Sequence, residues 1–233
     1  MSQSPPNTLP NPKCCEPGTA RAPAGVLVCF AVKEEARPFQ KLAEGRASLS
    51  VLVVGMGRLN ADRAIREALA KERPRLVLTC GFAGGLNPEL TAGAVVFSSD
   101  AEAKLDSTLQ AAGARPVRFH CAERVAATGA EKRALRESTG ADAVEMESDA
   151  IRAVCREQGI PGATVRVILD TADEDLPLDF NQLMTPDMRL DGAKLALAIM
   201  KAPGKIGALR RLQQQGNLCA EKLAQVLEKI TAV

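Results

Sequence analysis

Two acidic residues stand on either side of one predicted helix and one predicted strand. The helix of residues 147–158 begins at Glu147, and the apolar strand of residues 163–169 runs directly into Asp170. Because open parallel sheets bind ligands beyond the carboxyl ends of their strands, one strand and one helix can present both carboxylates at a single cleft. The pair would suit a reaction in which a sugar is held while a leaving group receives a proton.

Cleavage of a nucleoside glycosidic bond is such a reaction. It builds positive charge on the ribose ring and negative charge on the departing base. We expect Asp170 to be the general acid, because burial on its apolar strand would raise the pKa of its carboxyl group. Ionised Glu147 would accept hydrogen bonds from both ribose hydroxyls, and Met146 would lie beneath the sugar.

Each of these residues also has a purely structural interpretation. An acidic residue after a strand is often a helix cap, which is the alternative for Asp170. Glu147 and Glu35 could equally be first-turn acids that the helix dipole favours, and a methionine such as Met146 is more often part of a core. The functional interpretation therefore depends on whether these residues converge.

The predicted elements bring them to one edge of a sheet. From residue 25 onward, short apolar runs alternate with helical patterns, which is typical of a βαβ sheet. Four candidate features fall at the carboxyl ends of predicted strands: Glu35, the turn of residues 55–57, the GFAGG turn of residues 81–85, and Asp170. The predicted strands are residues 26–32, 49–54, 76–80, 94–98, 143–146 and 163–169, and the predicted helices include residues 107–112, 131–138 and 147–158.

The two glycine-rich turns would let backbone amides approach a ligand closely. The first turn contributes Gly57 and Arg58, the second begins with Gly81, and we expect these three residues at a phosphate or water site. The first turn, GMGRLN, begins like a dinucleotide fingerprint but has Asn60 in place of the last glycine, which argues against a nicotinamide enzyme. The alternative for Arg58 is simple solvent exposure.

Composition argues against several other classes of protein. The chain has 233 residues, of which 46% are apolar and 25% charged, as expected for one soluble domain. Its 30 basic residues nearly balance 28 acidic ones and are scattered, so no nucleic-acid partner is expected. With one histidine and no CxxC pair we expect no metal, and thiols within apolar stretches favour a cytoplasmic location. The proline-rich residues 1–24 are expected to form a disordered tail and not a signal peptide.

Three motifs resemble one known superfamily. GFAGGL at residues 81–86, AVEMES at 143–148 and VRVILDTAD at 165–173 resemble the purine nucleoside phosphorylases and the methylthioadenosine/S-adenosylhomocysteine nucleosidases. The resemblance implies an α/β fold, a single three-layer α/β/α domain around a central mixed twisted sheet. This domain would span residues 25–233 and include extra C-terminal helices from about residue 186. The resemblance also implies a homodimer or a larger homo-oligomer.

The resemblance assigns roles to the matching residues. Asp170 would be the acid at the purine base, Glu147 with Met146 would hold the ribose, and Glu35 would lie at the attacking water of the hydrolytic members. The matching motifs place four further residues among the expected substrate-binding groups: Phe82, Ala83, Gly84 and Glu145.

The chain also departs from the usual nucleosidase pattern. Leu169 stands where these enzymes usually carry Ser, Phe82 stands where they carry a small hydroxyl residue, and the aromatic segment of the base pocket is shortened. EKRALRESTGADAVEMES and the C-terminal tail are closer to the branch of hopanoid-associated phosphorylases, whose proposed substrate is an adenosyl lipid. The basic and apolar residues 195–212 could then touch a membrane surface, although packing of this helix onto the core is the favoured prediction.

The sequence therefore predicts an enzyme that releases adenine from a 5′-modified adenosine. Phosphate is the expected acceptor and would be a co-substrate, with no other cofactor; hydrolysis of methylthioadenosine-type nucleosides is the alternative. A non-catalytic nucleoside-binding protein on the same scaffold ranks next, because of the substitutions at Phe82 and Leu169. A nicotinamide-dependent oxidoreductase ranks last.

Overall fold

The structure is a computed structural model that describes residues 24–232, so the predicted tail of residues 1–24 lies outside the described residues except for Ala24. In chain order the elements are β1 (Ala24–Phe30), α1 (Lys33–Ala43), β2 (Leu49–Val53), α2 (Arg58–Leu69), β3 (Pro74–Gly85), β4 (Val95–Ser99), η1 (Ala101–Ala103), α3 (Asp106–Ala111), β5 (Arg115–Pro116), β6 (Phe119–Cys121), α4 (Gly129–Thr139), β7 (Ala143–Glu145), α5 (Ser148–Glu157), β8 (Gly162–Asp170), α6 (Phe180–Leu183), α7 (Gly192–Lys201), η2 (Pro203–Lys205) and α8 (Ile206–Thr231).

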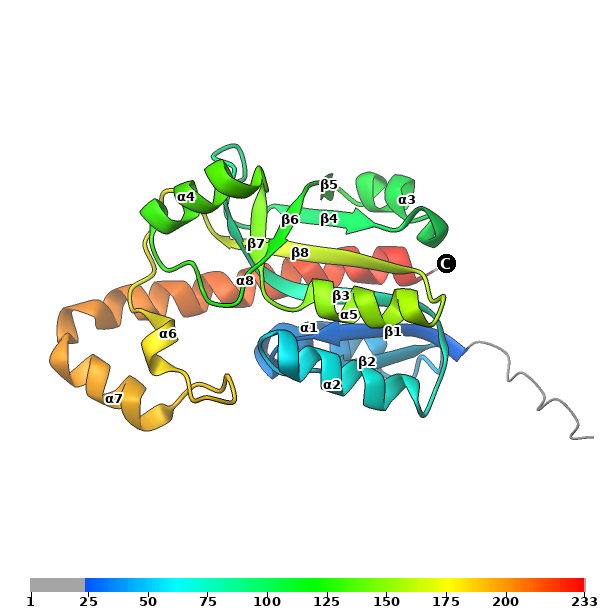
Figure 1. The fold of residues 1–233 in the computed structure, drawn as a ribbon, viewed down its shortest axis with the longest axis horizontal. Helices are drawn as coiled ribbons and strands as arrows, with labels where there is room; N and C mark the ends of the chain where they lie inside the picture. The colour runs from blue at the N-terminus through cyan, green and yellow to red at the C-terminus, as the bar shows by residue number, and fades with distance from the viewer. Residues whose placement is uncertain (1–23, 233) are drawn as a thin grey trace, which may run out of the picture.

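The strands form one mixed sheet. Its main path has the order β2-β1-β3-β8-β4-β5, in which β2, β1, β3 and β8 are parallel and β4 is antiparallel to β8. The short strand β7 pairs antiparallel with the end of β3, and β6 pairs parallel with β7. The first strands of the sheet thus run in one direction and bring their carboxyl ends to one edge (Figure 1).

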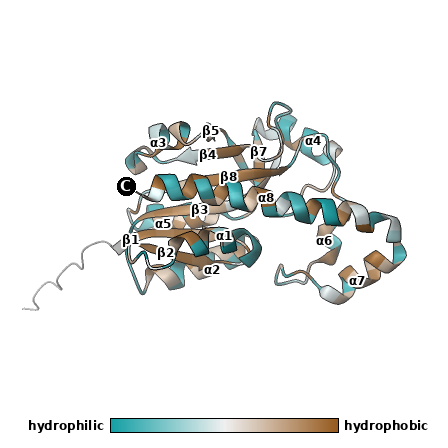
Figure 2. Ribbon diagram, turned by 180° about the vertical axis from the view of Figure 1, so that it is seen from behind, coloured by the Kyte–Doolittle hydropathy of each residue, from teal (hydrophilic) through white to brown (hydrophobic). Residues whose placement is uncertain are grey.

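Helices cover both faces of this sheet. On one face α1 and α8 pack together and bury Phe39 and Leu223 against β1, β3 and β8. On the other face α2 and α5 pack together and bury Ile65 and Ile151. The strands are largely hydrophobic, whereas α8 alternates hydrophilic and hydrophobic residues along its length (Figure 2). The three-layer α/β/α arrangement that the resemblance implies is confirmed.

The segment GFAGG is a strand, so the predicted turn at residues 81–85 is wrong. Strand β3 continues to Gly85, because Gly84 and Gly85 pair with Val144 and Ala143 of β7. On its other edge β3 pairs with β8 as far as Asp170, with an irregularity between Ala83 and Gly84. Glycine favours turns locally, but pairing on both edges outweighs that preference here.

Residues 184–218 form a protrusion that extends past the sheet. The C-terminal protrusion contains α7, η2 and the first half of α8, and it lies on the side where the carboxyl ends of β1 and β3 meet (Figure 1). None of its residues is buried; burial in α8 begins at Cys219. The prediction that residues 195–212 pack onto the core is therefore wrong. None of the helices within residues 24–232 is long and apolar enough to cross a membrane.

Candidate active site

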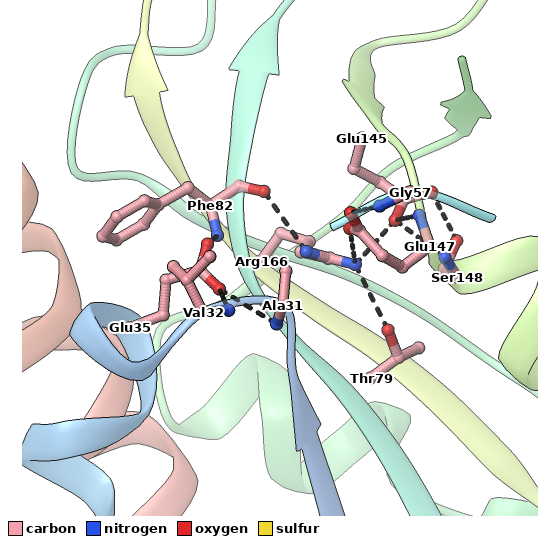
Figure 3. Close-up of polar contacts among 10 residues, drawn as sticks. All are labelled: Ala31, Val32, Glu35, Gly57, Thr79, Phe82, Glu145, Glu147, Ser148 and Arg166. Atoms are coloured by element: carbon pink, nitrogen blue, oxygen red, sulfur yellow. Dashed lines mark hydrogen bonds and ion pairs between the residues drawn. The ribbon is translucent and has the colours of Figure 1, made fainter. Parts of the chain in front are cut away.

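Arg166 is the centre of a buried polar cluster at the carboxyl ends of the strands. It lies within β8, and its Nη2 donates to Oε2 of Glu145 at 2.6 Å, to Oε2 of Glu147 at 3.2 Å and to the hydroxyl of Thr79 at 3.2 Å (Figure 3). Burial acts to lower the pKa of Arg166, but Glu145 and Glu147 outweigh it and raise that pKa further above the ordinary range. Arg166 is therefore a fixed positive charge between carboxylates.

Glu145 uses both of its oxygens inside the protein. In addition to Arg166, its Oε2 accepts the backbone amides of Glu147 and Ser148 at 3.0 and 2.8 Å. Its Oε1 accepts the hydroxyl of Ser148 at 2.6 Å. Glu145 was expected among the substrate-binding groups; the structure places it where it holds Arg166 and the start of α5.

Glu147 is the N-cap residue of α5, where the predicted helix begins. Its Oε1 accepts the backbone amide of Gly57 at 2.9 Å, and its Oε2 accepts from Arg166. Burial raises the pKa of Glu147, Arg166 lowers it and Glu145 raises it again. Each carboxylate oxygen has two acceptor positions, so one position on each remains for a ligand hydroxyl. Met146 is half-buried next to Glu147.

Glu35 approaches the same cluster from the first turn of α1. Its Oε2 accepts the amides of Ala31 and Val32 at 3.1 and 3.3 Å, and its Oε1 accepts the amide of Phe82 at 2.9 Å. Figure 3 shows Glu35 on one side of Arg166 and Glu145 with Glu147 on the other. Burial raises the pKa of Glu35 to about 7, against the opposing effect of Arg166. A carboxylate with that pKa suits proton transfer near neutral pH.

Gly81 allows Glu35 and Arg166 to come close. Its φ is +143°, and an added Cβ atom would lie 2.8 Å from both Nη1 of Arg166 and Oε2 of Glu35. Real Cβ atoms essentially never make contacts that short. Any side chain at position 81 would therefore push the carboxylate and the guanidinium apart.

Asp170 ends β8 and pairs with Gly84, but the extra residue Leu169 interrupts the alternation of side chains, so Asp170 does not point to the same face of the strand as Arg166. At about 3.3 Å per residue the two positions are about 13 Å apart along the strand. Asp170 is buried and forms an ion pair with Lys132 of α4, which is fully buried. Burial raises the pKa of Asp170, and the ammonium of Lys132 opposes that effect.

The ammonium of Lys132 has all three of its donors satisfied. Besides Oδ2 of Asp170, it donates to the carbonyl oxygens of Thr171 and Glu174 at 2.7 and 2.8 Å. Gly84 lies beside this pair, since an added Cβ atom would be 3.5 Å from Oδ2 of Asp170. Lys132 thus fixes both the carboxylate and the loop that follows β8.

Four other predicted site residues lie in different environments. The amide of Phe82 binds Glu35, while its ring packs at α8, 3.7 Å from the position of an added Cβ atom on Gly216. Ala83 is buried in a small apolar cluster. Arg58 is exposed on the first turn of α2, which matches the alternative of solvent exposure. The amide of Gly57 already serves Glu147.

Sequence reasoning did not identify Arg166 and Lys132. For Arg166 a signal existed, because a charged residue stands in the middle of the apolar strand VRVIL and must find a partner when buried. Lys132 lies in an ordinary charged helix, EKRALRES, where nothing local distinguishes it from its exposed neighbours. Its importance depends entirely on how α4 packs.

A separate cavity of about 570 Å³ lies between β4, β8 and α5, and its lining includes Ser98, Arg152 and Thr164. None of the predicted site residues lines it. Arg152 there donates to Ser98 and to Asp100, so its charge is already compensated. The cluster around Arg166, and not this cavity, contains the groups that can transfer protons.

Comparisons with known proteins agree with this fold. The family model of the phosphorylase superfamily matches residues 28–123 and 103–201. The 5′-methylthioadenosine/S-adenosylhomocysteine nucleosidase of Shewanella halifaxensis is 27% identical over 162 residues, which are 55% of this chain and 70% of the relative. The chain belongs to the phosphorylase superfamily, and the expected class of enzyme, nucleoside phosphorylases and nucleosidases, is confirmed at that level.

Solved structures show the same fold at lower sequence identity. Futalosine hydrolase of Helicobacter pylori superimposes with a TM-score of 0.66 at 15% identity, covering 90% of this chain and 97% of that chain. The nucleosidase of Neisseria meningitidis, in complex with methylthio-immucillin-A, superimposes with a TM-score of 0.65 at 17% identity, covering 90% and 99%. These similarities confirm the three-layer fold around a mixed sheet.

Proposed function

We propose that this protein hydrolyses the N-glycosidic bond of a 5′-modified adenosine and releases adenine. The observation that carries the proposal is the arrangement of Glu35 and Glu147 on opposite sides of Arg166, with Asp170 farther along the same strand. Glu147 would hold the ribose hydroxyls, Asp170 would donate a proton to the base, and Glu35 would remove a proton from the attacking water.

The charges around Arg166 support water as the acceptor, where the sequence favoured phosphate. Lys132 and Arg166 are the only buried basic residues within residues 24–232, and both already bind carboxylates. Glu35, Glu145 and Glu147 outnumber Arg166, so a phosphate dianion would meet a net negative environment. The proteins named above are two nucleosidases and a hydrolase, which also supports hydrolysis.

The two proton transfers of the proposed reaction use Asp170 and Glu35. The proton on Asp170 passes to the leaving base as the glycosidic bond breaks, and the water gives its proton to Glu35 as its oxygen bonds to the ribose carbon. Each such step contributes about 10² to 10⁴ in rate. Arg166 opposes the effect of burial on the pKa of Glu147 and so favours its ionised form, which would stabilise the positive charge that develops on the ribose.

The test is release of free base from 5′-methylthioadenosine and S-adenosylhomocysteine, with and without phosphate. We expect release without phosphate and loss of release in Asp170→Asn. Asp173→Asn is the matched control, because Asp173 is an exposed acid three residues away. Strict dependence on phosphate would replace hydrolysis by phosphorolysis, and binding of the nucleosides by a folded protein without any base release would select a non-catalytic binding protein.

A further inference from the structure

We propose that the C-terminal protrusion, residues 184–218, is a docking surface for an anionic lipid bilayer. Large apolar side chains on it are open to solvent: Leu197 is 50% exposed, Met200 78% and Leu218 63%. Helix α7 buries none of its residues, although it carries the apolar run LALAIM. Figure 2 shows its hydrophobic residues away from the sheet. Several exposed large apolar side chains within one segment indicate an interaction surface.

The charge of the protrusion points to an anionic partner. Between Asp191 and Glu221 the chain has no acidic residue. The same stretch carries five basic ones, Lys194, Lys201, Lys205, Arg210 and Arg211, although the whole chain has a formal net charge of only +2. Clusters of four or more Lys and Arg on an amphipathic helix are attracted to the anionic lipids of a membrane surface.

Apolar and basic side chains are combined on one side of α7. Lys194, Leu197 and Lys201 recur at spacings of three and four residues, which places them along one stripe of the helix. Such a helix lies in the plane of the lipid headgroups, with its apolar residues below them and its cations among them. The short helix η2 follows α7 and contributes a further basic residue, Lys205.

Both ends of the protrusion are attached at the candidate active site. Near its start, Met188 lies 3.4 Å from the position of an added Cβ atom on Gly57, and the carbonyl of Asp187 accepts from Asn60 at 2.9 Å. Near its end, an added Cβ atom on Gly216 would lie 3.7 Å from the ring of Phe82. Docking would therefore bring the site next to the bilayer. Only the following consequence rests on the proposed function: a substrate with an apolar 5′ group could reach the site from the membrane.

The test is co-sedimentation of the full chain with phosphatidylcholine vesicles, with and without about one third phosphatidylglycerol. We expect binding to the anionic vesicles at about 0.1 M salt and its loss at about 1 M salt, where charges are screened within a few Å. Lys201→Glu/Lys205→Glu and Leu197→Asp/Met200→Asp should each weaken binding by about tenfold or more. Lys41→Glu/Lys71→Glu and Leu42→Asp are matched controls, because these residues are exposed on or after α1 and α2.

Three outcomes would overturn the proposal. The first is the absence of vesicle binding by the folded wild-type protein. The second is binding that the charge reversals weaken but Leu197→Asp/Met200→Asp does not, which would show a polyanion site and no bilayer contact. The third is a wild-type dimer that Leu197→Asp/Met200→Asp converts to a monomer in light scattering, which would show that a second copy covers the surface. Because vesicle binding needs no turnover, its failure is independent of the proposed hydrolysis.

Discussion

Lys132 and Asp170 form a buried ion pair that connects α4 to the carboxyl end of β8. The ammonium also holds two backbone carbonyls of the loop after β8, so its removal would leave a buried carboxylate and two partly buried carbonyl oxygens without this donor. Lys132 is therefore a positioning residue for the proposed acid. Its charge also acts directly on the proton affinity of Asp170.

Replacing Lys132 by Met should move the alkaline limb of the pH profile of kcat/KM to higher pH. A general acid works only while protonated, and the ammonium favours the ionised form of Asp170, so its removal raises the pKa of that carboxyl group. The variant should also lose about 3 kcal/mol of stability, as is usual when one partner of a buried pair is removed. The measurement is base release as a function of pH, with urea unfolding alongside.

Arg133→Met is the matched control for this prediction. Arg133 is the next residue of α4, and its side chain is largely exposed. The Arg133→Met variant should leave both the alkaline limb of the pH profile and the free energy of unfolding unchanged. If Lys132→Met loses stability but keeps the wild-type alkaline limb, the pair serves only the fold.

Glu35→Gln should lower kcat by about 10² to 10⁴ while the protein still binds nucleoside analogues. As a base, Glu35 works only when ionised, and burial raises its pKa to about 7. Wild-type activity should therefore fall as the pH decreases through about 7, and Glu35→Gln should abolish that acid limb. Glu34→Gln, at the exposed neighbouring position, should behave like the wild type. Wild-type turnover in the Glu35→Gln variant would exclude Glu35 as the base.

The same shift predicts how stability depends on pH. The pKa of Glu35 is raised from 4.5 to about 7 in the folded protein, so the folded state binds this proton more tightly than the unfolded state. Its contribution is complete below pH 4.5 and is lost as the pH rises through about 7, by up to about 3 kcal/mol. Glu35→Gln should flatten the decrease in unfolding free energy between about pH 5 and about pH 8, measured with urea. If the unfolding free energy of Glu35→Gln depends on pH as steeply as that of the wild type, the raised pKa of Glu35 is contradicted.

Local patterns predicted the alternating strands and helices well. The apolar runs at β1, β2, β4 and β8 are found within two residues of their predicted bounds, because strands of a sheet that helices cover on both faces carry a continuous apolar sequence. The strands β5 and β6 are only two and three residues long and carry no such run. The GFAGG segment was misassigned because its strand character comes from pairing with β7 and β8, which are distant in sequence.

The acidic residues of the site were predictable, whereas their cationic partners were not. Glu35, Glu147 and Asp170 follow strands or open helices, so the topology of a parallel sheet places them at one edge. Lys132 and the protrusion depend on tertiary packing. An amphipathic pattern predicts that residues 195–212 cover a core, but it does not show whether a core surface is available at that place.

Gly81→Ala should lower kcat/KM by at least about tenfold and destabilise the protein by about 1–3 kcal/mol. Its Cβ atom would lie 2.8 Å from both Glu35 and Arg166, and the backbone at φ +143° disfavours any side chain. Gly45→Ala separates these two effects, because Gly45 has a φ of +76° but no atom within 4 Å of an added Cβ. Only backbone strain should appear there, without loss of activity. Gly81 has no group that could itself take part in the reaction. A loss of turnover in Gly81→Ala beyond that of Gly45→Ala would therefore show that catalysis requires the close approach of Glu35 to Arg166. Equal activity in the two variants would contradict this requirement.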